Sequence, residues 1–424
     1  IYKLLVLSYY FSNIFKLSFI KTLDNIGDEM LDKEMLIRLF DAASIQRWND
    51  RIRPMEFPEL DKQSHKMIIA FVISKFEQEN HKPGFDWIRV VEGGIFEMLQ
   101  RIVITDLKPQ LFHRIRRDTD RYCRLNNWIY AQIKGSIKSL GHGFSKRFKN
   151  YFQDLNEDIN KRILSASHFY STKWEFDILD KYNQGSLDIR EIREELRQKQ
   201  EKHYDIHGIR QLTLYSGLKN FVDLCGELRF QQRWSHVYRV PKTSVLGHML
   251  LVAIISYFLS LKIDACQRRC RNNFFAGLFH DLPEALTKDI VSPIKNSIKG
   301  FNELIKDYEN WEVSEKVYKM IPEKWHTEMD AFTKFEFKSL IHATSPEKII
   351  VSTQKISNSY NSDEYDPMDG EIVRLADHLT AFLEAFLSLE NGIKNKEFKK
   401  AATALMKKYR EAKLAGHDFG AIYR

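Results

Sequence analysis

The stretch FFAGLFHDLPEALTKDIVSPIK, residues 274–295, joins an apolar run to an adjacent histidine and aspartate. The apolar run predicts a buried helix, and the proline near its end marks where the helical structure stops. An imidazole and a carboxylate buried at the end of such a helix would be costly to desolvate without a partner. A bound metal ion offsets that cost, so the pair His280 and Asp281 predicts a metal site.

Two ligands are too few for a metal ion, and two more candidates lie on other apolar segments. His248 follows Thr243-Ser-Val-Leu-Gly, and Asp377 follows Ile372-Val-Arg-Leu-Ala. Two imidazoles and two carboxylates form a mixed nitrogen and oxygen donor set that leaves coordination positions open, as a catalytic metal requires. We therefore expect one divalent transition metal, and the donor set admits Mn²⁺, Co²⁺, Fe²⁺ or Zn²⁺.

The order of these residues, a lone His, then His-Asp, then a distant Asp on a helix, resembles the HD superfamily of metal-dependent phosphohydrolases. The chain is most similar to the bacterial 5′-deoxynucleotidases, which carry an Arg-Trp upstream of the first His, where Arg233-Trp234 stands here. The resemblance covers about residues 212–390. It implies hydrolysis of a phosphomonoester, in a (deoxy)nucleoside 5′-monophosphate, by metal-activated water. A phosphodiesterase, a nucleoside triphosphate hydrolase or a regulatory nucleotide-binding protein would use the same ligands.

Further site residues follow from the resemblance and from side-chain chemistry. Glu284 lies three residues after Asp281, near the same helix face, and suits proton transfer to or from the reacting oxygens. Arg233 suits bidentate binding of phosphate. Trp234 suits stacking on a base, although a Trp beside an apolar helix also fits simple packing. The other candidates are an acidic residue for water or sugar and two phosphate or rim contacts: Asp289, Thr287 and Lys295.

The fold class predicted by the periodicity is all-α. Apolar residues recur at three- and four-residue spacing in five segments of the N-terminal half, and alternating strand patterns are scarce. The predicted helices are residues 36–45, 66–76, 88–102, 125–137 and 148–163.

An internal repeat predicts two tandem HD-domain-like helical bundles, the first one degenerate. Arg47-Trp48 precedes an apolar helix that contains His65, as Arg233-Trp234 precedes His248. In this alignment Gly93-Gly94 corresponds to His280-Asp281, Glu97 to Glu284 and Asn127 to Asp377. Glycine has no donor atom and an Asn amide is a poor substitute for a carboxylate, so the N-terminal copy is predicted to bind no transition metal.

The predicted organisation has four parts: an apolar N-terminal segment (1–27), the degenerate HD-like domain (28–166), a helical linker (167–208) and the catalytic HD domain (209–424). A long insert occupies about residues 300–369 of the catalytic domain and could cap the pocket or bind a partner.

The composition suits a globular protein of the reducing cytoplasm. Four cysteines are few and unevenly spread, which favours free thiols. The net charge of +8 and pI near 9.0 fit a small phosphorylated substrate such as a nucleotide, and they do not exclude nucleic acid. The first 27 residues contain no uninterrupted apolar run of membrane-spanning length, so a membrane role is not favoured. A homo-oligomer is compatible with the sequence.

Overall fold

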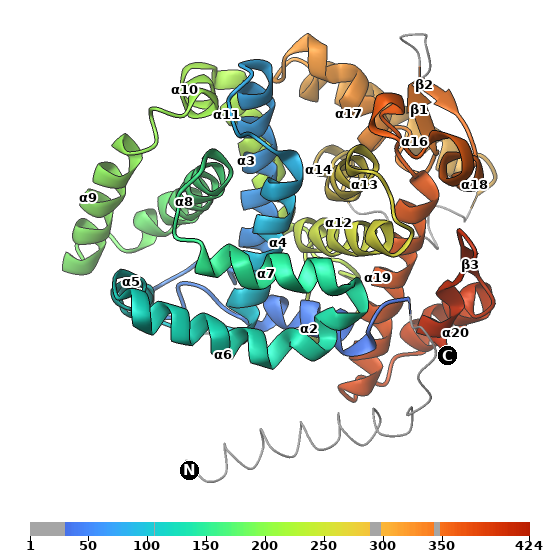
Figure 1. Ribbon diagram of the computed structural model, residues 1–424, viewed down its shortest axis with the longest axis horizontal. Helices are drawn as coiled ribbons and strands as arrows, with labels where there is room; N and C mark the ends of the chain where they lie inside the picture. The colour runs from blue at the N-terminus through green and yellow to red at the C-terminus, as the bar shows by residue number, and fades with distance from the viewer. Residues whose placement is uncertain (1–29, 106, 289–297, 343–347) are drawn as a thin grey trace.

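The computed structural model describes residues 30–105, 107–288, 298–342 and 348–424, and it confirms an all-α protein (Figure 1). The predicted apolar segment 1–27 lies outside the described residues. The helices of the N-terminal half are α2 (Lys33–Ser44), α3 (Glu59–Glu79), α4 (Trp87–Ile104), α5 (Pro109–Arg117), α6 (Thr119–Ile137), α7 (His142–Gln153), α8 (Ile159–Leu179), α9 (Leu187–Glu201) and α10 (His207–Leu214).

The helices that follow are α11 (Ser216–Glu227), α12 (Val245–Lys262), α13 (Gln267–Phe279), α14 (Glu284–Thr287), α16 (Phe301–Glu312), α17 (His326–Thr333), α18 (Thr353–Lys355), α19 (Gly370–Glu390) and α20 (Lys396–Tyr409). Two short antiparallel hairpins accompany them. They are formed by β1 (Leu340–His342) with β2 (Lys348–Ile350), and by β3 (Lys413–Leu414) with β4 (His417–Asp418).

Two long helices, α3 and α12, contact each other at a steep crossing near the centre of the molecule and share one hydrophobic core (Figure 1). Around α12 lie α13 and α19, and around α3 lie α8, α10 and α11. Phe71 of α3 reaches the C-terminal half directly, with its ring centroid 4.9 Å from that of Phe275 and 5.0 Å from that of Phe279. The two halves of the chain are therefore packed against each other through a continuous apolar interior.

Helix α12 is buried on all sides because its sequence is apolar on all sides. Val245–Lys262 is long and apolar enough to cross a membrane by length and composition alone, but 89% of it is buried inside the protein. Ser244 begins the helix by accepting a hydrogen bond from the Gly247 amide (2.9 Å) with its side chain, as N-cap residues do. Burial against α3, α13 and α19 marks α12 as a core helix.

The predicted helix at residues 148–163 is wrong, because two helices occupy this region. Helix α7 ends at Gln153, and α8 begins at Ile159 after the polar segment 154–158. Asp158 caps α8 by accepting from the Lys161 amide (2.9 Å). The apolar spacing continues across this break, while the cluster of Asp, Asn and Glu residues carries the signal for a new helix start.

Helix α8 covers the first part of the predicted linker and packs on α3 with Ser167, Phe169 and Phe176 buried. The charged tract that follows forms α9, where Ile189 is the buried residue and which lies at the edge of the molecule (Figure 1). The segment predicted as an insert contains α16, α17, α18 and the first hairpin.

The two residues that the sequence paired with metal ligands in the N-terminal half have other roles. Asn127 is exposed on α6, where its side-chain oxygen accepts a 3.4 Å hydrogen bond from Gln153. His65 is fully buried, with Nε2 3.0 Å from the backbone oxygen of Val222 and its ring against Trp174. The proposed equivalence of Asn127 with Asp377 is wrong, because α6 holds this residue at the surface.

Candidate metal centre

The first residue of the centre, His248, sits one turn into α12. Its amide donates to the backbone oxygen of Ser244 (2.9 Å), so the capped helix start fixes its position. The imidazole is fully buried. Gly247 beside it has no side chain, and a Cβ there would lie 2.8 Å from Asp61 Oδ1. Helix α3 therefore packs directly against the turn that carries His248.

His280 and Asp281 lie at the C-terminal end of α13. The His280 Nδ1 atom is 2.9 Å from the Gly277 carbonyl oxygen, a contact that directs Nε2 away from its own helix. Gly277 lets α13 approach α12, because a Cβ at this position would lie 2.8 Å from the Cα of Ala253. The close approach of the two helices brings His280 next to His248, with ring centroids 5.5 Å apart.

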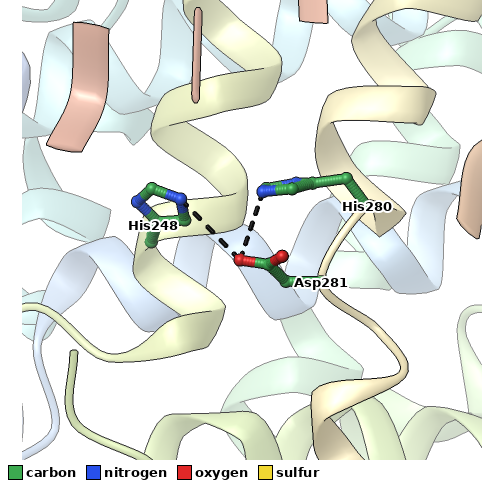
Figure 2. A group of neighbouring side chains, drawn as sticks. All are labelled: His248, His280 and Asp281. Carbon is green, nitrogen blue, oxygen red and sulfur yellow. Dashed lines mark ion pairs between the residues drawn. The ribbon is translucent and has the colours of Figure 1, made fainter. Parts of the chain in front are cut away.

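Side chains from three helical segments meet at this point. The ligand atoms of His248, His280 and Asp281 all lie within 4.8 Å of one another, as Figure 2 shows. Asp281 Oδ2 is 3.2 Å from His280 Nε2 and 3.8 Å from His248 Nε2. Asp377 on α19 completes the group, with Oδ1 3.1 Å from His248 Nε2 and 4.0 Å from His280 Nε2. All four predicted ligands are thus gathered around one point.

The donor atoms of this group fit a divalent cation. His280 Nε2 is buried and has no hydrogen-bond partner among the described residues, although it faces two carboxylates. A buried nitrogen whose contacts with carboxylates form no hydrogen bond is costly unless a ligand satisfies it. Two imidazole nitrogens and two carboxylates also match the donors that divalent transition metals accept.

The carboxylates make the centre attractive to positive charge. Burial and then Arg233 lower the pKa of His248, but Glu384 and Asp377 outweigh both and raise it to about 9. Burial raises the pKa of Asp281, yet His280 and then Arg233 hold it below its ordinary value. Protons and metal ions compete for the same imidazole nitrogens, so a divalent cation would displace protons here.

Glu384, which the sequence analysis did not predict, lies next to the Nδ1 atom of His248 and not among the four predicted ligands. It is fully buried on α19 and accepts hydrogen bonds from Trp234 Nε1 (2.9 Å) and Thr243 Oγ1 (2.7 Å). Its Oε1 atom also lies 3.4 Å from His248 Nδ1. Carboxylates in this position orient a ligating imidazole and raise its basicity. The signal in the sequence is its spacing of two helical turns from Asp377.

Arg233 and Trp234 lie in a tight turn before α12 and reach the centre in different ways. Gln232 pairs with Ser244 in an isolated bridge, and Trp234 adopts a positive φ of 58°. Arg233 Nη1 is 4.0 Å from Asp281 Oδ2, which places a guanidinium beside the ligands. The Trp234 indole donates to Glu384 and packs on Phe398 with centroids 5.3 Å apart. These contacts favour packing over base stacking for Trp234.

The remaining predicted site residues follow Asp281 along the chain. Glu284 is buried at the start of α14, and its amide donates to the Asp281 carbonyl oxygen (3.0 Å). Thr287 Oγ1 is 3.3 Å from Glu309 of α16, so the region predicted as an insert packs against this segment. Asp289 and Lys295 lie outside the described residues.

Comparison with known proteins finds one family model and several relatives. Residues 225–406 match the family of the HD domain. A 5′-deoxynucleotidase of Pasteurella multocida is 22% identical over 199 residues, covering 44% of this chain and 83% of the relative. Those of Photobacterium profundum and Shewanella oneidensis are 28% and 27% identical, each covering 42% of this chain and 77% of the relative. The matched family span contains all four predicted ligands.

Proposed function

We propose that this chain, which is similar to the HD domain family over residues 225–406 and to bacterial 5′-deoxynucleotidases, is an HD-superfamily phosphohydrolase that hydrolyses (deoxy)nucleoside 5′-monophosphates in the cytoplasm. The observation that supports the proposal best is the convergence of His248, His280, Asp281 and Asp377 on one point. The names of the relatives supply the substrate class, and the buried donor set supports the chemistry.

In this proposal a bound divalent metal supplies Lewis acidity, which polarises a phosphoryl oxygen and makes water a stronger acid. Arg233 binds the phosphate oxygens beside the ligands, since a planar guanidinium matches their geometry. The Glu284 carboxylate takes the proton of the attacking water and delivers a proton to the leaving 5′-oxygen. A bond forms between phosphorus and the water oxygen, the bond to the 5′-oxygen breaks, and nucleoside and phosphate are released.

The other predicted residues keep supporting roles in this proposal. Asp289 orients the water or binds a sugar hydroxyl, and Thr287 and Lys295 contact phosphate or line the rim. Trp234 lines one side of the site, and its indole is held there by the hydrogen bond that it donates to Glu384. A carboxylate at position 284 is the feature on which the proton transfers depend.

The test is a metal-supplemented assay on the full chain. Metal-stripped protein receives Mn²⁺, Co²⁺, Fe²⁺ or Zn²⁺ and a panel of nucleoside 5′-monophosphates, 3′-monophosphates, triphosphates and cyclic diesters. We expect metal-dependent release of phosphate from the 5′-monophosphates. Preferred cleavage of triphosphates or diesters would replace the substrate class, and no turnover with any metal would leave a regulatory binding protein.

Variants separate metal binding from proton transfer. Asp281→Ala should lose the metal in elemental analysis, because it removes a ligand between two imidazoles. Glu284→Gln should keep the metal and lower kcat by about two to four orders of magnitude, the range for general acid-base catalysis. Glu397→Gln, an exposed glutamate beside His236, is the control and should change neither. Full metal content in Asp281→Ala would contradict the ligand assignment.

A further inference from the structure

The N-terminal half contains a second turn built like the one that precedes His248. Trp48 and Trp234 both have positive φ, 54° and 58°, and both turns close with an isolated bridge, Gln46 to Pro58 and Gln232 to Ser244. Each indole Nε1 donates to a buried glutamate at 2.9 Å, Glu175 on α8 or Glu384 on α19. The backbone thus aligns α3 with α12 and α8 with α19.

This alignment puts two basic residues where the other half has metal ligands. Lys62 follows Trp48 by fourteen residues (48 to 62), as His248 follows Trp234 (234 to 248). His168 precedes Glu175 by seven residues, as Asp377 precedes Glu384. Lys62 Nζ contacts His168 Nδ1, and the corresponding pair, His248 and Asp377, is also in contact. The two pairs of positions therefore correspond, but Lys62 stands in the place of His248 and His168 stands in the place of Asp377.

The cations here are buried, and one of them has no carboxylate partner. Lys62 and Lys66 are one turn apart on α3, and both are fully buried. Lys66 pairs with Glu97 (2.5 Å), whereas in the described part of the chain Lys62 forms no ion pair and contacts His168. Burial holds the pKa of Lys62 well below its ordinary value, and Arg47 and Lys66 add to this effect while Glu59 opposes it. A bound anion would favour the charged form of Lys62 and would provide its counterion.

The surrounding charges do not supply that anion. Arg47 Nη1 bonds to Glu59 (3.0 Å) and its Nε to Glu175 (2.9 Å), so both carboxylates are already engaged. Glu175 is shared with a further guanidinium, Arg229. Burial lowers the pKa of His168 well below its ordinary value, and Lys62, Arg47, Lys66 and Arg101 lower it further. The imidazole therefore stays neutral among these cations and offers no negative charge.

Solvent reaches this group of residues. Part of His168 reaches the surface although its Nδ1 atom packs against the buried Lys62, and the side chains of Glu97 and Arg101 keep 29% and 20% of their surface accessible. Arg101 Nε is 3.7 Å from Glu59 and has no hydrogen-bond partner within the described ranges. We call Lys62, Lys66, Arg101 and His168 the lysine cluster. It combines donors, positive charge and access, which are the requirements for binding a phosphoryl group.

We propose that the lysine cluster binds the phosphoryl group of a phosphate monoester without a metal ion. Lys62 has the position of the predicted ligand His248 in this alignment, and Lys66 lies one turn further along α3. The site lies outside the HD domain match at residues 225–406 and takes no part in the proposed hydrolysis.

The experiment measures binding of inorganic phosphate and of a deoxynucleoside 5′-monophosphate to the full chain by calorimetry. Chelator-treated protein carrying Arg233→Ala removes both metal and guanidinium from the C-terminal site. In this background Lys62→Gln should weaken phosphate binding about tenfold or more, because it removes a charged donor. Lys75→Gln is the matched control, since Lys75 lies on the same helix and pairs with Glu328 outside the cluster.

Circular dichroism and thermal unfolding show whether each variant folds. If Lys62→Gln does not fold, the partly exposed Arg101→Gln replaces it, with the same expected loss of affinity. Saturable binding that Lys62→Gln and Arg101→Gln both leave unchanged would overturn the proposal, as would the absence of saturable binding in the Arg233→Ala background. The readout involves no turnover, so it is independent of the proposed hydrolysis.

Discussion

At the scale of single residues, Glu384 shows how a candidate ligand is held in place. One carboxylate joins the indole of Trp234, the hydroxyl of Thr243 and the far side of the His248 ring. With Nδ1 of His248 directed at Glu384, Nε2 is left to face Asp281 and Asp377. Glu384 is a positioning residue in this arrangement, because it acts on the centre through His248.

Glu384→Gln should weaken metal binding about 10- to 100-fold, the usual effect of losing a carboxylate behind a ligating imidazole. The amide keeps the size of the side chain and one acceptor oxygen. Metal titration gives the dissociation constant, and kcat at saturating metal should change much less than that constant. An unchanged dissociation constant in the folded variant would remove Glu384 from this role.

The sequence predicted the four ligand candidates but not Glu384, because nothing in the local sequence distinguishes this glutamate. His280 and Asp281 stand out because a charged pair after an apolar run is unusual. Glu384 stands between Leu383 and Ala385 and resembles any helix residue until its partners are known. In the N-terminal half, similarity of residue types led to Asn127, whereas the backbone turn and the equal seven-residue spacing to Glu175 and to Glu384 lead to His168.

At the scale of elements, one carboxylate, Glu328, joins the region predicted as an insert to the core through two ion pairs. Arg271 on α13 lies over the Trp87 ring, 4.4 Å from its centroid, and pairs with Glu328 on α17. Lys75 on α3 bonds to the same carboxylate at 2.7 Å. Burial raises the pKa of Glu328, but Arg271 and Lys75 outweigh it and lower the value to about 2. Helix α17 is therefore held by both halves of the chain.

Glu328→Gln should destabilise the protein by about 3 kcal/mol at pH 7, since it leaves buried cations without their partner. A lowered pKa contributes stability that is present above the ordinary value of 4.5 and lost as the pH falls through about 2. Urea unfolding should thus show a difference that shrinks between pH 7 and pH 3. Glu315→Gln, at a surface pair with Lys319, is the control, and an equal effect of both variants would contradict the prediction.

Periodicity predicted α2, α3, α4 and α6 of the N-terminal half, because apolar residues recur at helical spacing in each of them. It failed between Phe148 and Ile163, where two helices happen to continue the same spacing across a polar break. The packing of α17 depends on a pair between residues 271 and 328, and no local pattern marks such a contact.

At the scale of the whole molecule, α3 and α12 meet through a buried polar contact. Asp61 Oδ1 accepts a 2.6 Å hydrogen bond from Ser244, the N-cap residue of α12. Burial raises the pKa of Asp61 to about 6 despite the nearby Arg229 and the bond from Ser244, and Glu175 adds to the increase. The contact joins the helix of the lysine cluster to the helix of His248. The predicted boundaries at residues 166 and 208 remain a prediction, since the apolar interior is continuous across the halves.

Asp61→Asn should stabilise the protein at pH 8 by up to about 3 kcal/mol, because the amide keeps the bond to Ser244 and carries no buried charge. A raised pKa contributes stability that is full below the ordinary value of 3.8 and lost as the pH rises through about 6. The gain should therefore vanish below about pH 4. Thermal unfolding across this range checks it, with exposed Asp50→Asn as control. A gain independent of pH would show that ionisation of Asp61 is not its cause.

The two tryptophan turns bear on how relatives of this chain are recognised. A turn that hydrogen-bonds its indole to a buried glutamate occurs in both halves, so an Arg-Trp pair has a structural role that does not depend on catalysis. An Arg-Trp pair alone is then a poor indicator of a catalytic site. A motif search that relied on it would match this chain at both Arg47-Trp48 and Arg233-Trp234. The informative position is fourteen residues after the tryptophan, which is lysine in the N-terminal half and histidine in the C-terminal half.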